Sequence, residues 1–285
     1  MTTHTRTDVT GEPTAVYLYG VARGLDPAAL EGTTGVAGTA VRAVAAGDLT
    51  ALVSTVRLDQ YGEEALRANL EDLTFLEETA RAHHHVVDRA ARAAPTAPVR
   101  IATLYRDDER IGEILTQRRE QFTEVLDSIT GRTEWGVKAY AHPDAYEEAP
   151  AATGTTATAG TGTGTGTSAG AGAGTAYLKR RQDQRRRRED ATRRITAQAE
   201  AVHDELAGHA VAARRHPPQD PRLSGHQGTL ILNTAYLVDD EASQAFLKVA
   251  DDIAARLPGI EVEVTGPWPP YSFIETPDTG ARNAS

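Results

Sequence analysis

The chain has 285 residues, a formal net charge of −10 at neutral pH and no cysteine. Its 40% hydrophobic and 5% aromatic content is enough for packed cores but not for a membrane protein, and no run of about 18 apolar residues is present. The absence of cysteine excludes disulfides, thiolate nucleophiles and cysteine-ligated zinc, and it fits a cytoplasmic location. Residues 1–13 lack the basic-then-apolar pattern of a secretory signal, and we interpret them as a disordered tail.

Strand and helix patterns alternate over residues 14–148, which predicts an N-terminal α+β domain. The apolar run 15–22 is typical of a strand covered on both faces. A Gly-Asp pair divides 41–54 into a predicted hairpin. Leucines at spacings of three and four predict one long helix over 62–94, with Leu73 in its buried stripe. The remaining predicted elements are, in order, a strand at 99–105, a helix at 111–129 and a strand at 134–141.

Residues 149–176 contain only Ala, Thr, Gly, one Ser and one Pro. No large side chain is available to offset the loss of backbone entropy, so we predict a flexible linker here. Residues 177–276 then read as a C-terminal domain, and 277–285 as a disordered tail. The pattern in this domain is a long helix from Tyr177, a strand, a helix and two strands, the last at 271–274. It predicts a small mixed or antiparallel sheet with helices on one face.

The first half of the long helix is strongly basic. Between Tyr177 and Arg194 there are nine Lys or Arg and three Asp or Glu, a net of 9 − 3 = +6, so the rest of the chain carries −10 − 6 = −16. Such asymmetry can steer an acidic partner, and the candidate contact residues are Arg185, Arg186, Arg187 and Arg188. A solvated helix is the simpler alternative. A nucleic-acid-associated helix over 179–194 is another, but only Tyr177 is near for base stacking, so nucleic acid is not expected as a partner.

Catalytic and metal motifs are missing from the sequence. His83, His84 and His85 are adjacent, and neighbouring helical residues point about 100° apart, so the three cannot converge on one metal ion. We expect one half-buried histidine, His84 in the apolar stripe, and two exposed ones. No Walker, GxSxG or HExxH pattern is present. We therefore predict a non-enzymatic protein without catalytic, metal-binding or cofactor-binding residues. An active site scattered over the chain remains the alternative.

The stretch GPWPPYSF, from Gly266 onward, holds one of only two tryptophans. Prolines cannot donate ladder hydrogen bonds, so we interpret the stretch first as a structural corner with Trp268 packed on a sheet or helix. The alternative is a partner-binding platform, since exposed aromatic residues suit interfaces. The candidate binding residues of that platform are Trp268, Pro269, Pro270 and Tyr271.

Several of these stretches occur together in a known order. They are VYLYGV, APVRIATLY, EWGVKAY, GTAYLKRR and LNTAYLV…FLKVADDIA…GPWPPYSF. Together they resemble the gas vesicle protein F/L family, over nearly everything from Ala15 to Ile274 except the linker. The terminal TGPWPPYSF is the most specific piece. The family often has Phe-Gly where this chain has Ile101-Ala102.

The resemblance implies a two-domain α+β protein with a ferredoxin-like C-terminal domain. It also implies a minor vesicle component or assembly factor, located at the gas vesicle in the cytoplasm. The implied partners are the main gas vesicle shell protein, whose aggregation it would limit, and other accessory gas vesicle proteins. No catalytic residue is assigned to the family, and neither a cofactor nor a membrane is implied. The F and L types are not distinguished by these residues.

Overall fold

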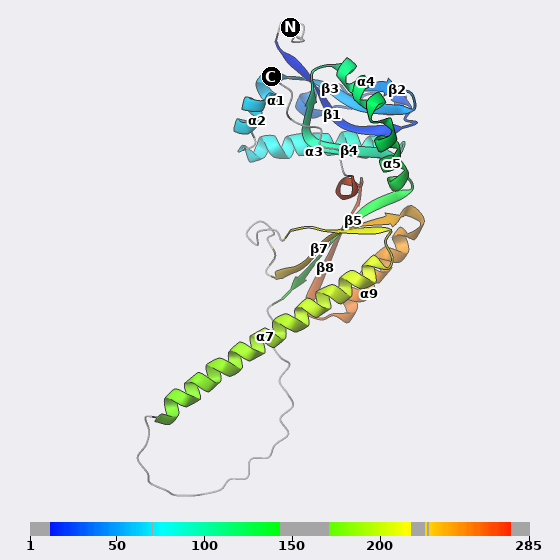
Figure 1. Ribbon diagram of the computed structural model, residues 1–285. Helices are drawn as coiled ribbons and strands as arrows, with labels where there is room; N and C mark the ends of the chain where they lie inside the picture. Colours follow the sequence, from blue (N-terminus) through cyan, green and yellow to red (C-terminus); the bar gives the residue numbers. More distant parts are fainter. Residues whose placement is uncertain (1–11, 70, 143–170, 218–225, 227, 275–285) are drawn as a thin grey trace, which may run out of the picture. The chain divides into compact units, whose positions relative to one another are not determined.

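The computed structural model describes residues 12–69, 71–142, 171–217, 226 and 228–274. Two four-stranded sheets with helices confirm the predicted α+β class (Figure 1). Most of the predicted N-terminal tail and linker, and all of the predicted C-terminal tail, lie outside the described residues. The chain divides into two compact units, of which the first is Met1–Trp135, Leu237–Glu241 and Gly266–Ser285, and the second is Gly136–Tyr236 and Ala242–Thr265.

The sheet of the first unit has the strand order β2-β3-β1-β4. Its central strand β1 pairs antiparallel with both β3 and β4 and is buried along nearly its whole length. The predicted hairpin is confirmed, because β2 and β3 pair from Arg42↔Val53 to Ala46↔Leu49. The elements of this unit are β1 (Thr14–Arg23), η1 (Pro27–Leu30), η2 (Val36–Gly38), β2 (Arg42–Ala46), β3 (Leu49–Arg57), α1 (Leu58–Tyr61), α2 (Glu63–Asn69), α3 (Leu73–Ala91), β4 (Thr96–Tyr105), α4 (Asp108–Gln117), α5 (Arg119–Ile129) and η4 (Tyr271–Phe273).

Helices cover both faces of this sheet, and each face has its own core. Tyr17 and Tyr19 of β1 lie in the core under α3, whereas Val16 and Leu18 lie in the core under α4 and α5. The alternation follows from the two-residue period of a strand. Figure 1 shows α3 on the opposite side of the sheet from α4 and α5. Because both faces are covered, the continuous apolar run at 15–22 was a correct indication of a buried strand.

The single helix predicted over 62–94 is wrong in one respect. The chain forms two helices, α2 and α3, and Asp72 caps the second by accepting hydrogen bonds from the backbone N–H groups of Thr74 and Phe75. The break shifts the phase of the buried stripe, so Leu73 is 78% exposed. The residues of α3 that are buried are Thr79, His83, Val86, Val87 and Ala90. The helix predicted over 111–129 is likewise divided, into α4 and α5 at Arg118.

Strand β4 is irregular where it passes the middle of β1. Leu18 pairs with Thr103, but Gly20 pairs with Pro98, so β4 contains extra residues between these two pairs and forms a bulge. Within this bulge Ala102 has φ = 63°, and its N–H donates to the Tyr17 hydroxyl at 3.0 Å. A left-handed conformation favours glycine, which explains physically why the Gly of a Phe-Gly pair suits this position.

We predict that Ala102→Gly stabilises the fold by about 0.5–1 kcal/mol, because glycine adopts a positive φ without steric cost. Ala97→Gly is the matched control, since Ala97 lies in the same strand but pairs regularly with Val21. This control is expected to destabilise, because it loses burial and gains unfolded-state entropy. Urea unfolding of both variants measures the difference. A loss of stability in Ala102→Gly comparable to that of the control would contradict the explanation.

The second sheet has the strand order β6-β7-β5-β8. Strand, helix, strand, strand, helix and strand follow each other along the chain, which is the order of a ferredoxin-like unit. Helices α7 and α9 contact each other in this unit. The elements of this sheet and its connections are β5 (Arg132–Ala141), α7 (Ala171–Ala207), β6 (Ala212–Arg215), β7 (Thr229–Asp239), η3 (Asp240–Ala242), α9 (Ser243–Arg256) and β8 (Ile260–Trp268). Arg132–Trp135, Leu237–Glu241 and Gly266–Trp268 are counted in the first compact unit.

Strand β5 belongs to this sheet although it precedes the predicted linker. Residues 134–141 were predicted to be part of the N-terminal domain. In the structure β5 lies between β7 and β8, so residues 177–276 cannot form the sheet by themselves. The segment from Gly266 onward, which was expected in the C-terminal domain, belongs to the first compact unit.

Among the side chains of α7 that the structure describes, the buried ones lie in the second half of the helix. The expected apolar stripe is present, with Ile195, Ala199, Val202 and Leu206 buried, and Ala191 extends it by one turn. Leu178, near the start, is 63% exposed. Figure 1 shows the first half of α7 extending beyond the strands of its unit. This is the arrangement expected of a half-helix that has no sizeable apolar residue between Leu178 and Ile195.

Candidate functional site

The stretch GPWPPYSF, residues 266–273, contains the candidate residues Trp268, Pro269, Pro270 and Tyr271. It belongs to the first compact unit. Strand β8 continues through Trp268. The expected interruption of strand pairing before the tryptophan is therefore wrong. Pro269 and Pro270 are buried, and the predicted strand at 271–274 is wrong because Tyr271–Phe273 forms the 3-10 helix η4. Gly266 has φ = 131°, and a Cβ there would come within 3.0 Å of the Glu134 carbonyl oxygen and the Trp135 ring. The bend therefore requires glycine.

A buried carboxylate holds this segment. Glu134 is only 7% exposed, and its two oxygens accept hydrogen bonds from the backbone N–H of Ser272 at 2.8 Å and from the Ser272 hydroxyl at 2.7 Å. A bidentate contact to an ionised group is stronger than one between neutral groups. It fixes η4 on the first unit, where Tyr271 joins the core under α3 and Ile274 joins the core under α4 and α5.

The aromatic residues of the segment lie against the histidines of α3. The ring centroid of Trp268 is 5.2 Å from that of His84, at an angle of 67°. Tyr271 lies 6.1 Å from His84 and 6.3 Å from His83 between centroids, and its hydroxyl is 3.4 Å from Nδ1 of His84. Trp268 still exposes 38% of its surface. It is therefore a packing residue on one side and an exposed aromatic surface on the other.

His83 is the buried histidine, in contrast to the expectation that placed His84 in the apolar stripe and His83 outside it. It is 1% exposed, His84 is half-buried and His85 is exposed, which follows from the shifted phase of α3. Its Nδ1 lies 3.0 Å from the Tyr17 hydroxyl, which also accepts the N–H of Ala102. Burial lowers the pKa of His83 to about 4 and raises the pKa of Tyr17. At neutral pH the cluster is uncharged and serves to pack α3 on β1 and β4.

We predict that Trp268→Ala lowers stability by about 1–2 kcal/mol. A fully buried Trp→Ala change costs about 3–5 kcal/mol, and this side chain keeps more than a third of its surface in water. Trp268→Phe is the matched control, because it keeps a ring over His84. Thermal unfolding checks both. An unchanged melting temperature in Trp268→Ala would show that packing of the Trp268 ring against His84 does not stabilise the fold in solution.

The arginine run, Arg185 to Arg188, lies in the first, exposed half of α7. Arg185 to Arg188 are all exposed, and Arg185 forms an ion pair with Glu189 at 2.8 Å. In the part of the chain that the structure describes, no ion pair involves Arg186, Arg187 or Arg188. The run belongs to the second compact unit, whereas Trp268, Pro269, Pro270 and Tyr271 belong to the first. The two groups of candidate residues thus belong to different compact units.

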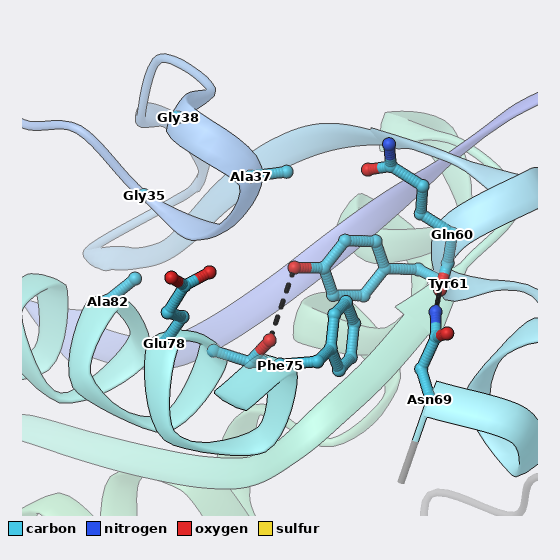
Figure 2. Close-up of a pocket in the computed structure, with 10 residues that line it drawn as sticks. Gly35, Ala37, Gly38, Gln60, Tyr61, Asn69, Phe75, Glu78 and Ala82 are labelled. Carbon is cyan, nitrogen blue, oxygen red and sulfur yellow. Dashed lines mark hydrogen bonds between the residues drawn. The ribbon is translucent and has the colours of Figure 1, made fainter. Parts of the chain in front are cut away.

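A pocket of about 510 Å³ opens in the first unit between η2, α1 and the first half of α3 (Figure 2). The rings of Tyr61 and Phe75 line it with their centroids 5.5 Å apart, and the Tyr61 hydroxyl is 3.4 Å from the Thr79 hydroxyl. Figure 2 shows the Glu78 carboxylate pointing toward the loop of Ala37. Burial raises the pKa of Tyr61, with a smaller contribution from the charge of Glu78. The side-chain amide of Asn69 donates to the Gln60 carbonyl at 3.1 Å.

No group of three or more His, Asp or Glu side chains among the described residues is placed to hold a metal ion. In the same residues, no helix combines the length and the apolar character needed to cross a membrane.

Comparison with known proteins decides the family. The family model described as gas vesicle synthesis protein GvpL/GvpF matches residues 15–275. The chain belongs to this family. Gas vesicle protein L of Streptomyces sp. (strain CB03234) is 40% identical over 260 residues, which cover 90% of this chain and 91% of that protein. Gas vesicle protein F of the same strain is 25% identical over 263 residues, covering 92% and 100%. The chain is thus closer in sequence to the L protein of that strain, and it belongs to a family of non-enzymatic gas vesicle proteins.

Solved structures agree with this family at the level of the fold. The gas vesicle protein GvpF of Anabaena sp. PCC7120 superimposes with a TM-score of 0.61 at 18% identity, covering 91% of this chain and 95% of that one. GvpF of Microcystis aeruginosa gives the same TM-score at 17% identity, covering 91% and 98%. At such identities the likeness concerns the fold alone.

Sequence reasoning missed the residues that hold the C-terminal segment. Glu134 lies in a strand pattern and Ser272 is an ordinary small polar residue, so neither stands out. Their contact joins positions 138 apart in the chain. The only available indication was an acidic residue placed next to Trp135 inside an otherwise buried strand, where an ionised side chain requires partners.

Proposed function

We propose that this protein is a minor gas vesicle component that binds the main shell protein and limits its aggregation during vesicle formation. The observation that carries the proposal is the family match over residues 15–275 together with the 40% identity to a gas vesicle protein L. A shell subunit must hide apolar surface before it is incorporated, and such patches associate with each other in water. A folded binder that covers them would keep the subunit available for assembly.

Trp268 is the proposed contact for apolar surface. A tryptophan held at the end of β8 and exposed over 38% of its area offers apolar area at a low cost in side-chain entropy. Pro269 and Pro270 are buried, so they act by positioning Trp268 rather than by contact, and Tyr271 packs against the same histidine, His84, as the tryptophan does. The exposed arginines 185–188 are the proposed contact for an acidic partner, among which we include other accessory gas vesicle proteins.

The proposed place of action is the gas vesicle inside the cytoplasm. A test follows from the proposed role in limiting aggregation. The genes required for vesicle formation are expressed with this chain, without it, or with Trp268→Ala in its place. We expect the shell protein to move into the aggregated fraction, and vesicles seen by electron microscopy to become rare, in the last two cases.

Trp268→Phe is the control, because it keeps an aromatic surface and should retain most vesicles. Protein levels of each variant must match on immunoblots. Normal vesicle numbers and an unaggregated shell protein in the complete absence of the chain would reject the proposal. Normal numbers with Trp268→Ala alone would reject Trp268 as the contact.

A further inference from the structure

The pocket in the first unit has the chemistry of a guanidinium site. It is lined by a half-buried ring, Phe75, and by the exposed carboxylate of Glu78, and the exposed side-chain amide of Gln60 supplies a further acceptor. Arginine combines a flat cation that stacks on aromatic rings with a fork of donors that matches a carboxylate. An apolar ligand would offer the Glu78 carboxylate no hydrogen-bond or charge partner, and an anion would be repelled by it.

The surroundings of the pocket are acidic. From Asp59 to Ala82 the chain carries seven carboxylates and two arginines. Both arginines are already engaged, Arg67 with Glu63 and Arg81 with Glu77. Glu78 has no ion pair among the residues that the structure describes, and neither do Glu64 and Glu71 on the same stretch. A partner that brings positive charge is therefore favoured here.

The same chain carries a matching segment. Leu178, Arg181, Arg185 and Arg188 recur at spacings of three and four, so they share one face of α7. Leu178 is 63% exposed, and all three arginines are exposed. This face offers one apolar side chain followed by guanidinium groups. Such a sequence fits a pocket that is lined by an aromatic ring and a carboxylate.

We propose that the pocket of one molecule binds residues 178–188 of α7, which include the arginine run, from a second copy of this chain. Charge complementarity between a +6 segment and a remainder of −16 supplies the attraction. Each copy carries both halves of the contact, and a closed pair in which the contact is made twice is part of the proposal. The proposal gives the arginine run a partner and does not depend on binding to the shell protein.

Sedimentation velocity of the purified full-length chain, alone, tests the self-association. At micromolar concentration we expect dimers in about 50 mM salt and monomers in about 500 mM salt, because exposed charges are screened at the higher ionic strength. Glu78→Gln should weaken the association at least about tenfold, the factor expected for a lost charge-assisted hydrogen bond. A peptide of residues 178–194 should compete with it.

Glu77→Gln is the matched control for Glu78→Gln. It removes the adjacent carboxylate of α3, which pairs with Arg81 and does not line the pocket. It should leave the dimer intact. Changing Arg185 to Arg188 to Gln together should abolish the dimer, and changing the same four to Lys should retain most of it. Because these arginines lie on an exposed half-helix, the quadruple variants keep the proposal testable even if Glu78→Gln fails to fold.

A mixing experiment separates contact between copies from contact within one chain. Glu78→Gln keeps residues 178–188, and the quadruple Gln variant keeps its pocket, so one of the two contacts stays intact in a mixture. The two should form a one-to-one heterodimer at a concentration where each variant alone is monomeric. No heterodimer in the mixture would overturn the proposal. A monomer at low salt, or equal effects of Glu77→Gln and Glu78→Gln, would overturn it as well.

Discussion

Lowering the pH from 7 to 4 is expected to destabilise the fold by about 3 kcal/mol through His83 alone. Its pKa is about 4 in the folded state, because the ring is buried, and about 6.5 in the unfolded chain. Above the unfolded value the ring is neutral in both states, so the full stability is present. As the pH falls, the unfolded chain takes up the proton first, and the loss grows until the folded value is reached.

Urea unfolding at pH 7, 5.5 and 4 measures this loss, with His83→Gln as the variant that cannot titrate. Gln at this position still offers an acceptor to the Tyr17 hydroxyl. It should be less stable at pH 7, but its stability should fall less between pH 7 and 4. His85→Gln is the control, because His85 is exposed and its removal should not alter the slope. Equal slopes for the wild type and His83→Gln would contradict a neutral, buried His83.

Removing the Glu134 carboxylate is expected to cost about 3 kcal/mol and to loosen the C-terminal segment. In Glu134→Ala the N–H and the hydroxyl of Ser272 lose a charged acceptor, and each hydrogen bond to a charged group contributes about 1.5–3 kcal/mol. We expect a lower melting temperature. We also expect faster chymotrypsin cleavage after Tyr271 and Phe273, since η4 would no longer be held.

Glu124→Ala is the control for this variant, because Glu124 is an exposed carboxylate on α5. It should change neither melting nor cleavage. A Glu134→Ala protein that melts normally and resists chymotrypsin would mean that the Glu134–Ser272 contact does not hold the segment. In that case the position of Trp268 would have to depend on its packing against His84 alone.

The elements with clear periodicity could be predicted from the sequence. The run at 15–22 has no polar residue, and the structure covers both of its faces. The stripe from Ile195 to Leu206 recurs at helical spacing, and the helix buries it. The lack of sizeable apolar residues between Leu178 and Ile195 correctly indicated that this half of the helix is not packed in a hydrophobic core. In each case one local pattern was sufficient, because the side chains themselves define the buried face.

The assignment of strands to sheets could not be predicted, because it depends on contacts between distant residues. Nothing local in 134–141 shows that β5 pairs between β7 and β8. The break before α3 depends on one capping aspartate, Asp72, inside an otherwise helical pattern. It shifted the buried histidine from the expected His84 to His83. The anchoring of Trp268 by Glu134, Ser272 and His84 likewise joins residues far apart in the chain.

Binding to the shell protein is tested most directly by co-purification. The tagged full-length chain is co-expressed with the main gas vesicle shell protein and recovered under mild conditions, beside Trp268→Ala and Trp268→Phe. We expect the shell protein to be recovered with the wild type and with Trp268→Phe, and to be largely lost with Trp268→Ala that is still folded. Failure of the wild-type chain to recover any shell protein, while remaining folded and well expressed, would contradict a shell-binding role.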